Sequence, residues 1–473
     1  MDRYKKGDDR NQMTMEPMCL DDMISADAEV RALELIVDKM DVRSLGFTHC
    51  ETKQTGRMPY DPVDMFKLYT YSYFNGIRSS RKIEKECHRN IELMWLIGNL
   101  CPDFKTIADF RRNNKKQIKA AFQRFSTICE ELGLIGKEIV AVDGSKFRAS
   151  NSRLRYHSVK KLDEKIKYHA EKAEQYIKLL DACDKEEESQ PQLTREKIIE
   201  RIDKINERLV ALSALREEVS KNGTIYETDS DARMMQTNNK GPDICHNVQI
   251  AVDDKSHLVV AVDVTSQQLD KEQLYNIASQ AKENMSIDKL TVVADKGYYS
   301  AKEFEKCENN GIEPIVSKAD QSFHANTSGY EKDNFIYDEE NNRYICPAGV
   351  ELSPFRNRTE GSIRYANIKA CKKCPQKSDC TKGKYRMIHV KTHERYARII
   401  DKRTKDKMGI YKKRQMLVEH PFGTVKRALG FTYFLTRGTE NVRTESVMHF
   451  LIYNMKRVIN TVGMRGLATD LQR

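Results

Sequence analysis

The sequence predicts an α/β protein: a mixed sheet that carries two insertions, preceded by an all-helical N-terminal block. Three observations support this. Apolar residues recur at helical spacing through the first block, short apolar runs typical of buried strands follow, and a stretch rich in Lys, Glu and Leu interrupts those runs. The 473 residues suffice for about three domains. No stretch approaches 18 consecutive apolar residues, which excludes a membrane-spanning helix.

The N-terminal block, residues 1–135, is expected to be a helical domain and a candidate for DNA binding. Its arginines Arg78, Arg81, Arg111 and Arg112 are expected to be exposed. Helices with exposed arginines suit DNA docking, but they equally suit any solvated helical bundle. Start signals such as Pro62 and stop signals such as Asn-Gly and Leu-Gly predict helices at 17–45, 62–76, 79–98 and 103–132.

The sheet domain is expected to span residues 136–460. Buried strands are predicted at 138–144 and 289–295, a hairpin at 244–252 and 257–265, a short strand at 313–316, and helices at 267–284 and 300–310. Strands that alternate with helices in this way indicate a mixed sheet covered by helices.

Two insertions interrupt the predicted sheet domain. Residues 155–222 are expected to form two long helices joined by a turn at Ser189-Gln190-Pro191. Residues 318–400 lack a long periodic pattern, contain four cysteines, and are expected to form loops and short strands. From about Lys405 the chain becomes helical, with an amphipathic helix at 441–460 and a tail at 461–473.

The positive charge is concentrated at the C-terminal end. Residues 381–473 hold 21 Lys and Arg against 7 Asp and Glu, while the whole chain has a net charge of +11. A basic segment on a nearly neutral body predicts an acidic polymer as partner, most simply nucleic acid. The alternative is a solvated basic face.

The cysteines divide into two groups. Eight are scattered singly, and with no apolar run after the charged N-terminus they predict a cytoplasmic chain with reduced thiols. The other four, in the second insertion, have the spacing Cys346-x24-Cys371-x2-Cys374-x5-Cys380. Four thiolates suit tetrahedral, structural Zn²⁺. Four free thiols in a loop are the alternative.

Two carboxylates follow buried strands. Asp143 and Asp295 each end an apolar run and precede a glycine closely, and ligands in α/β sheets bind at the carboxyl ends of strands. Together they could hold Mg²⁺, with Glu419 as third carboxylate. The alternatives are that each Asp belongs to a turn and that Glu419 lies on a helix surface. Asp253 and Asp263 compete as strand-end acids.

Cationic residues surround Glu419. On one helix, Tyr411, Arg414 and Glu419 would lie within about 140° of arc and could face one site. Pro421 is expected to kink or restart that helix, which would place Lys426 and Arg427 on a second segment. Cations beside a carboxylate suit a site that binds phosphates.

Five motifs in order resemble the insertion-sequence transposases with an Asp-Asp-Glu triad. They are YFNGIRSSRKIEKECHRN with PDFKTIADFRR, then VAVDGSKFRA, HNVQIAVD, VVADKGYYS and YKKRQMLVEHPFGTVKR, and the resemblance runs with gaps from about residue 17 to 460. It implies an RNase H-like fold. The gap from Arg414 to Glu419 is one residue longer than in the commonest family signature. By the resemblance, the catalytic triad is Asp143, Asp295 and Glu419, and the matching DNA-binding residues are Tyr411, Arg414, Lys426 and Arg427.

The resemblance also implies an activity. Two Mg²⁺ or Mn²⁺ ions per site would support cleavage of DNA at the ends of an insertion element and strand transfer into target DNA. The expected partners are double-stranded DNA and, in the DNA complex, a second copy of the chain. Such a protein would be nucleoid-associated. The alternatives are a catalytically silent DNA-binding descendant and an RNase H-like nuclease without strand transfer.

Overall fold

The computed structural model describes most of the chain. The described residues are 19–50, 58–152, 155–185, 192–237, 241–318, 329–330, 332–355, 362–391 and 393–472.

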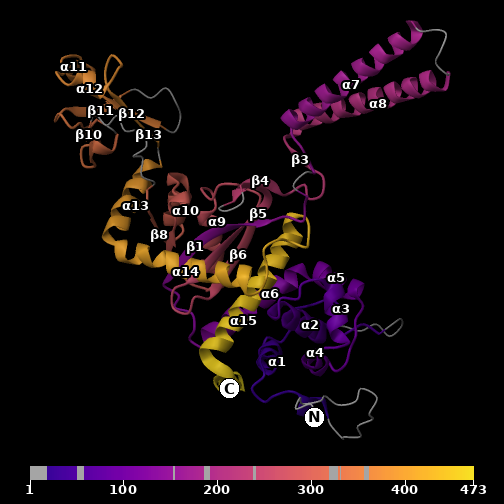
Figure 1. Ribbon diagram of the computed structural model, residues 1–473. Helices are drawn as coiled ribbons and strands as arrows, with labels where there is room; N and C mark the ends of the chain where they lie inside the picture. Colours follow the sequence, from indigo (N-terminus) through magenta and orange to yellow (C-terminus); the bar gives the residue numbers. More distant parts are fainter. Residues whose placement is uncertain are drawn as a thin grey trace, which may run out of the picture.

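A mixed sheet forms the centre of the molecule (Figure 1). Its central strand β1 (Ile139–Arg148) pairs antiparallel with the long β5 (Gly241–Asp253) and parallel with β7 (Leu290–Ala294). Two outer strands complete the order: β6 (Val259–Thr265) lies antiparallel to β5, and β8 (Ile312–Val316) lies parallel to β7. The short β4 (Arg233–Thr237) pairs with the start of β5. The predicted mixed sheet is confirmed.

Helices cover both faces of this sheet (Figure 1). The apolar run Val140–Val142 is fully buried, as expected of a strand that is covered on both faces. Four helices do most of the covering. They are α9 (Leu274–Asn284) and α10 (Ala301–Asn309) on one face, and α14 (Met408–Arg427) and α15 (Thr439–Gln472) on the other.

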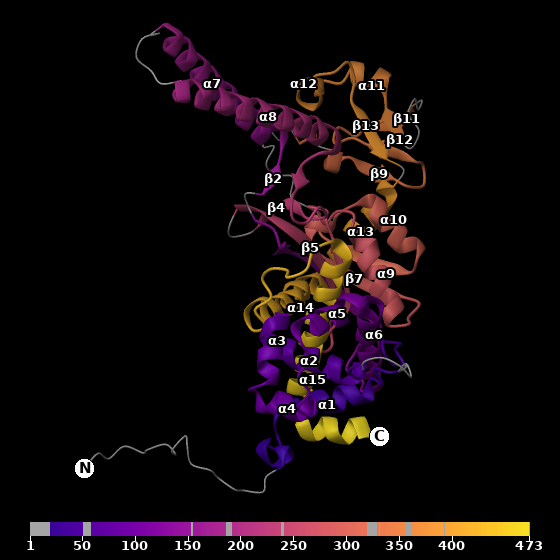
Figure 2. The same cartoon turned by 90° about the vertical axis from the view of Figure 1, so that its right-hand side faces the viewer.

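The N-terminal helices form one group, in which α1, α2 and α6 pack against α15 (Figure 2). They are α1 (Glu29–Lys39), α2 (Pro62–Phe74), α3 (Ser80–Cys87), α4 (Ile91–Leu96), α5 (Phe104–Asn113) and α6 (Lys115–Glu131), after the short 3₁₀ helix η1 (Leu20–Met23).

Three of the four expected N-terminal helices differ in the structure: within 17–45 only η1 and α1 form, and the helices expected at 79–98 and 103–132 are each broken in two. One helix ends at Cys87, and Asn90 caps the next by accepting a bond from the Leu93 N–H. Asn114 is buried and bonds to Thr48, which holds it outside regular helix geometry. Asparagine competes with the backbone in this way, so both breaks have a local cause.

The expected exposure of Arg78 is wrong. Its side chain is buried, donates to the Tyr433 carbonyl at 2.7 Å, and lies over the rings of Phe431 and Tyr433. It also pairs with the buried Glu445. Burial is tolerated because the guanidinium finds both an acceptor and a counter-charge. Arg78 therefore ties the N-terminal helices to the C-terminal segment.

Two long helices lie within residues 155–222, the first of the two insertions expected from the sequence. Its helices α7 (Val159–Lys185) and α8 (Gln192–Asn222) project from the body, and β2 (Tyr156–His157) pairs with β3 (Ile225–Tyr226) at their base (Figure 1). Leu162, Leu212 and Val219 form a small buried core near that base. The turn expected at Ser189-Gln190-Pro191 lies outside the described residues.

The second insertion carries a separate five-stranded antiparallel sheet. Its small core includes Tyr344, Leu352 and Tyr365. After this sheet, α13 (Glu394–Asp406) begins before Lys405, where the helical region was expected to start. The other elements are η3 (Lys332–Asn334), β9 (Ile336–Asp338), β10 (Arg343–Ile345), β11 (Glu351–Phe355), β12 (Ser362–Ala366), α11 (Ile368–Lys372), α12 (Lys377–Cys380) and β13 (Met387–Lys391).

The C-terminal helices depart from two expectations. Helix α14 continues through Pro421 to Arg427, so the expected restart at Pro421 is wrong; the proline ring is buried there. Helix α15 extends to Gln472, with a non-helical Gly463, where a tail was expected. One buried apolar cluster includes Phe66 of α2 and Val140 of β1. The division into domains at residue 135 stays a prediction.

Candidate active site

Asp143 lies inside strand β1 and not at its end. The strand runs on to Arg148, because β5 continues to pair with β1 beyond Asp143. The pairing with β7 stops at Val142, so Asp143 is the first residue of β1 beyond the end of its parallel neighbour. The expectation of a strand that ends at Asp143 is therefore wrong, and so is the alternative of an Asp-Gly turn there. The carboxylate accepts a bond from the Gly144 N–H at 2.9 Å.

Asp295 directly follows the last residue of β7. Its side chain caps the 3₁₀ helix η2 (Lys296–Tyr298) by accepting the Lys296 N–H at 2.6 Å. Because Val142 pairs with Ala294, Asp143 and Asp295 emerge from adjacent parallel strands. Arg414 on α14 reaches this edge, with its guanidinium 3.9 Å from Asp295 Oδ1.

The environment of Asp143 favours its neutral form. Burial is the main cause, and together with the negative charges of Asp270 and Asp295 it raises the pKa of Asp143 to about 6. The Gly144 N–H and the Arg414 charge oppose this rise. A carboxylate kept close to other acids is one that a bound cation would stabilise.

Alternation along β1 sets which side chains face α14. Ser145 follows Asp143 by two residues, and its hydroxyl accepts a bond from Lys426 Nζ at 2.5 Å. Phe147 follows in turn, with Lys426 Nζ 4.5 Å above its ring. Lys426 therefore lies on the α14 face of β1, on the same continuous helix as Arg414.

Glu419 does not join the two aspartates. It lies on the exposed side of α14 and accepts a bond from Gln415 Nε2 at 2.8 Å. Tyr411 is half-buried and Arg427 is exposed on the same helix. Within the described part of the chain, no group of three or more His, Cys, Asp or Glu side chains is arranged to hold a metal ion. The structure thus brings together Asp143, Asp295 and Arg414 of the predicted residues.

Sequence reasoning missed Asp270. Residues 267–284 were expected to be helical, but α9 begins only at Leu274, and Asp270 lies in the loop before it. Its carboxylate accepts bonds from Asn247 Nδ2 at 2.6 Å, Gln249 Nε2 at 2.8 Å and Lys146 Nζ at 3.2 Å. No spacing in the sequence indicates this cluster, because its donors come from two separate strands.

Family comparisons match both ends of the chain. Residues 18–113 match the family described as "Transposase domain (DUF772)", and residues 345–459 match the one described as "Transposase DDE domain". These two matches support an insertion-sequence DDE transposase. Its function is DNA transposition, which makes DNA its partner. The second match includes Glu419; neither match includes Asp143 or Asp295.

Two other comparisons add little. A cryo-EM structure of the piggyBac transposase synaptic complex with hairpin DNA aligns with 95% of this chain and 85% of that chain. The identity is 7% and the TM-score is 0.25, which is too low to indicate a shared fold. No curated protein matches the transposase. Among its described residues, no helix is long and apolar enough to cross a membrane.

The competing acids of the transposase hold the fold together. Asp253 is buried at the end of β5 and accepts bonds from the N–H groups of Gly136, Lys255 and Ser256. Asp263 in β6 pairs with Arg443 on α15 at 2.6 Å. Neither carboxylate lies at the edge shared by Asp143 and Asp295, so we do not count them in the site.

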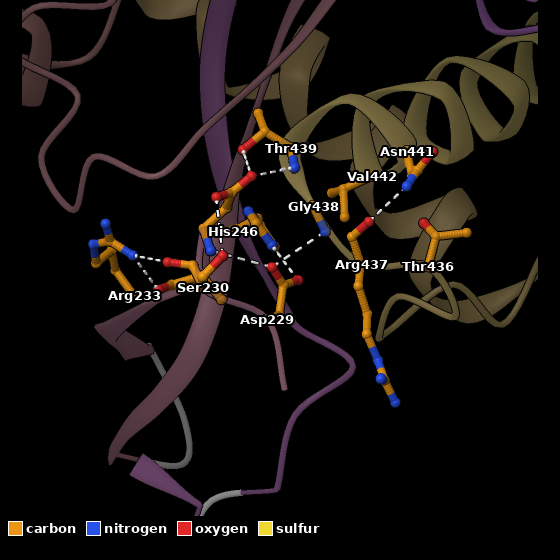
Figure 3. Close-up of polar contacts among 12 residues, drawn as sticks. Asp229, Ser230, Arg233, His246, Thr436, Arg437, Gly438, Thr439, Asn441 and Val442 are labelled. Carbon is orange, nitrogen blue, oxygen red and sulfur yellow. Dashed lines mark hydrogen bonds and ion pairs between the residues drawn. The ribbon is translucent and has the colours of Figure 1, made fainter. Parts of the chain in front are cut away.

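A buried His–Asp pair joins β5 to the start of α15 (Figure 3). His246 Nε2 and Asp229 Oδ2 are 3.0 Å apart, and both side chains are fully buried. Asp229 also accepts the Gly438 N–H at 3.2 Å. Burial opposes ionisation of Asp229, but these bonds and the His246 charge outweigh it and lower the Asp229 pKa. The pair has a structural role in the transposase.

The four cysteines of the second insertion line one small pocket. Cys346 follows β10, Cys371 and Cys374 lie in and after α11, and Cys380 ends α12. The Val350 N–H donates to Cys346 Sγ at 3.3 Å. Burial, with the nearby thiols of the other three, raises the pKa of Cys380. The thiols face one pocket but are not arranged to hold a metal ion.

Proposed function

We propose that this transposase cleaves DNA at the ends of its element and joins the freed 3′ hydroxyl to target DNA in one metal-dependent site. One observation carries the proposal: Asp143 and Asp295 emerge side by side from paired parallel strands, and Arg414 extends from α14 to Asp295. Magnesium sites that act on phosphates need only one or two protein carboxylates, since water and phosphate supply the other ligands.

The donor set fits Mg²⁺ or Mn²⁺. Asp143 and Asp295 would hold the ions, and bound ions would activate a water and neutralise charge on the scissile phosphate. Glu419 is the proposed third carboxylate. It would have to turn from Gln415 toward the aspartates when DNA and metal bind. Its position on the same helix as Arg414 supports this role.

The cations of α14 would hold the DNA backbone. Arg414 would orient a phosphate beside Asp295, and Lys426 would fix Ser145 and the strand that carries Asp143. Tyr411 and Arg427 lie on the same helix and would extend the contact along the strand. Such positioning, with charge stabilisation, is the protein's main contribution to phosphodiester chemistry.

The sheet supports an RNase H-like fold as the finer description. In the order β6, β5, β1, β7, β8, the first two strands are antiparallel to their neighbours and the last three are parallel. The proposed site lies on the central strand and on the end of its parallel neighbour.

A cleavage and strand-transfer assay tests the proposal. Purified protein is incubated with labelled duplexes that carry the ends flanking its gene, with Mg²⁺, Mn²⁺ or EDTA. Asp143→Asn, Asp295→Asn and Glu419→Gln should each abolish cutting and joining. The matched control is Asp406→Asn, which removes an exposed acid at the end of α13 and should act like wild type.

The outcomes separate the alternatives. Metal-dependent cutting and joining, lost in the three variants, would establish the transposase site. Cutting without joining would indicate a nuclease. DNA binding without cutting, equal in wild type and variants, would indicate a catalytically silent protein. Light scattering of the protein with and without end DNA tests the proposed homodimer, which should form with DNA.

We also propose that the four clustered cysteines bind a structural Zn²⁺. The support is that Cys346, Cys371, Cys374 and Cys380 line one pocket, and that the small separate core around them needs further stabilisation. The ion would draw the thiolates together from their present positions. Burial raises the pKa of Cys380, and a metal would favour its thiolate.

Metal analysis of protein purified under reducing conditions tests the zinc site. Wild type should contain one Zn²⁺ per chain, and Cys374→Ser should lose it. Cys101→Ser removes an exposed thiol from the N-terminal helices and should keep the metal. Zinc-free wild type, or equal zinc in all three proteins, would refute this site.

A further inference from the structure

A polar cluster lies behind the proposed site, on the other face of β1. We call it the Asp270 network; it consists of Lys146, Asn247, Gln249, Asp270 and Tyr298. Gly144 and Lys146 alternate with Asp143 along β1, so they face α9 while Asp143 faces α14. Gly144 pairs with Gln249 and Lys146 with Asn247 across β1 and β5, which places these donors on one surface.

Asp270 is the centre of this network. Three residues donate to it, Asn247, Gln249 and Lys146, and both of its oxygens lie 3.2 Å from Lys146 Nζ. Asn247 and Gln249 are fully buried. Each amide nitrogen has one further acceptor, the Gln267 carbonyl for Asn247 and Asn247 Oδ1 for Gln249, and Asp270 accepts the remaining N–H of each. Leaving a buried donor without an acceptor costs free energy, so these bonds hold the Asp270 carboxylate in one position.

The network also reaches the segment that follows Asp295. The buried Tyr298 in η2 donates its hydroxyl to Gln249 Oε1, while Gln249 Nε2 donates to Asp270. A chain of side-chain bonds therefore links the turn that carries Asp295 to the strand that carries Asp143. This chain of bonds ends at Lys146, which lies three residues after Asp143 on β1 and donates to Asp270.

Gly144 shows how tightly the network fits against β1. A Cβ atom on Gly144 would lie 2.2 Å from Gln249 Nε2 and 2.8 Å from Asp270 Oδ1. The backbone next to Asp143 thus rests directly on these two side chains. Any side chain at residue 144 would displace them.

We propose that Asp270 is a positioning residue for the two aspartates of the proposed active site. By holding Gln249 and Lys146, it fixes the spacing between the Asp143 strand and the Asp295 turn, and so the geometry offered to divalent ions. This inference rests on the proposed function, because the spacing matters only if both carboxylates bind metal. Partners behind metal ligands commonly change metal affinity or activity by about 10- to 100-fold.

The test combines Mn²⁺ binding, followed by electron paramagnetic resonance, with the metal dependence of DNA cutting. Asp270→Ala should weaken Mn²⁺ binding and raise the half-maximal Mn²⁺ concentration for cutting by about 10- to 100-fold. Its affinity for end DNA in EDTA should not change. Tyr298→Phe removes only the hydrogen bond from the Tyr298 hydroxyl to Gln249, and it should weaken Mn²⁺ binding less than Asp270→Ala does. The matched control Glu272→Gln removes an exposed charge two residues from Asp270 and should act like wild type.

The results distinguish this inference from the proposed function. If wild type binds Mn²⁺ and cuts, and Asp270→Ala and Tyr298→Phe keep wild-type metal affinity, the positioning role is refuted and the site stands. If wild type binds Mn²⁺ without cutting, the binding data alone decide the role of Asp270. If wild type binds no Mn²⁺, both are refuted. Should Asp270→Ala fail to fold by circular dichroism, Tyr298→Phe and Asp270→Asn carry the test.

Discussion

Asp143→Asn should stabilise the metal-free protein while it removes activity. Burial and neighbouring acids raise the pKa of Asp143 from its ordinary value of 3.8 to about 6. One pKa unit corresponds to about 1.4 kcal/mol, so keeping this carboxylate charged costs the fold about 3 kcal/mol at neutral pH. Asparagine has nearly the same shape, carries no charge, and can still accept the Gly144 N–H.

The pH dependence of this gain has a definite sign. Above pH 6 the Asp143 carboxylate is charged in both the folded and the unfolded chain, so the full cost is present. Below 3.8 it is neutral in both states and the cost disappears. The advantage of Asp143→Asn should therefore be about 3 kcal/mol at pH 7.5 and about half of that at pH 5.

Urea unfolding in EDTA, followed by circular dichroism at both pH values, measures this difference. Asp406→Asn, at an exposed acid, is the control and should change the free energy of unfolding little at either pH. Added Mg²⁺ should stabilise wild type and leave Asp143→Asn unaffected, because a ligand stabilises only the state that binds it. An Asp143→Asn protein no more stable than wild type at pH 7.5, or a gain that is equal at both pH values, would refute the reasoning.

Three further predictions concern residues outside the aspartate pair. Arg427→Met should reduce the slope of log affinity against log salt for end DNA by about one, as measured by fluorescence anisotropy, because Arg427 is exposed on α14 and is proposed to contact the DNA backbone; an unchanged slope would exclude that contact. Asp229→Ala should cost about 3–5 kcal/mol in urea unfolding near pH 7, because it leaves His246 buried without its partner. Since the Asp229 pKa lies below its ordinary value, this loss should shrink as the pH falls below about 4, and a constant loss would contradict the assignment. Arg78→Met should lower the melting temperature and loosen the N-terminal helices, because Glu445 loses its buried counter-charge; limited proteolysis that cuts both proteins equally would argue against this link.

Most helices and strands of the sheet domain, and the family, could be predicted from the sequence alone. Apolar runs such as Val140–Val142 and the helical spacing of apolar residues in 155–222 depend on local periodicity, which is readable without a structure. The five ordered motifs identified the insertion-sequence transposases, and the family comparisons agree at both ends of the chain. Asp143 and Asp295 could be found because each closes a short apolar run, although only Asp295 lies after the end of its strand.

Which polar side chains contact one another depends on packing between distant segments, so only the folded structure shows it. The pairing of β5 with β1 carries the strand past Asp143, and no local signal shows that a partner strand will continue. Arg78 was expected on the surface, but its acceptors lie more than 350 residues away. Asp270 could not be predicted because its partners lie on β1 and β5, and contacts between such distant segments depend on packing. For the same reason, spacing along a helix could not determine whether Glu419 faces the aspartates.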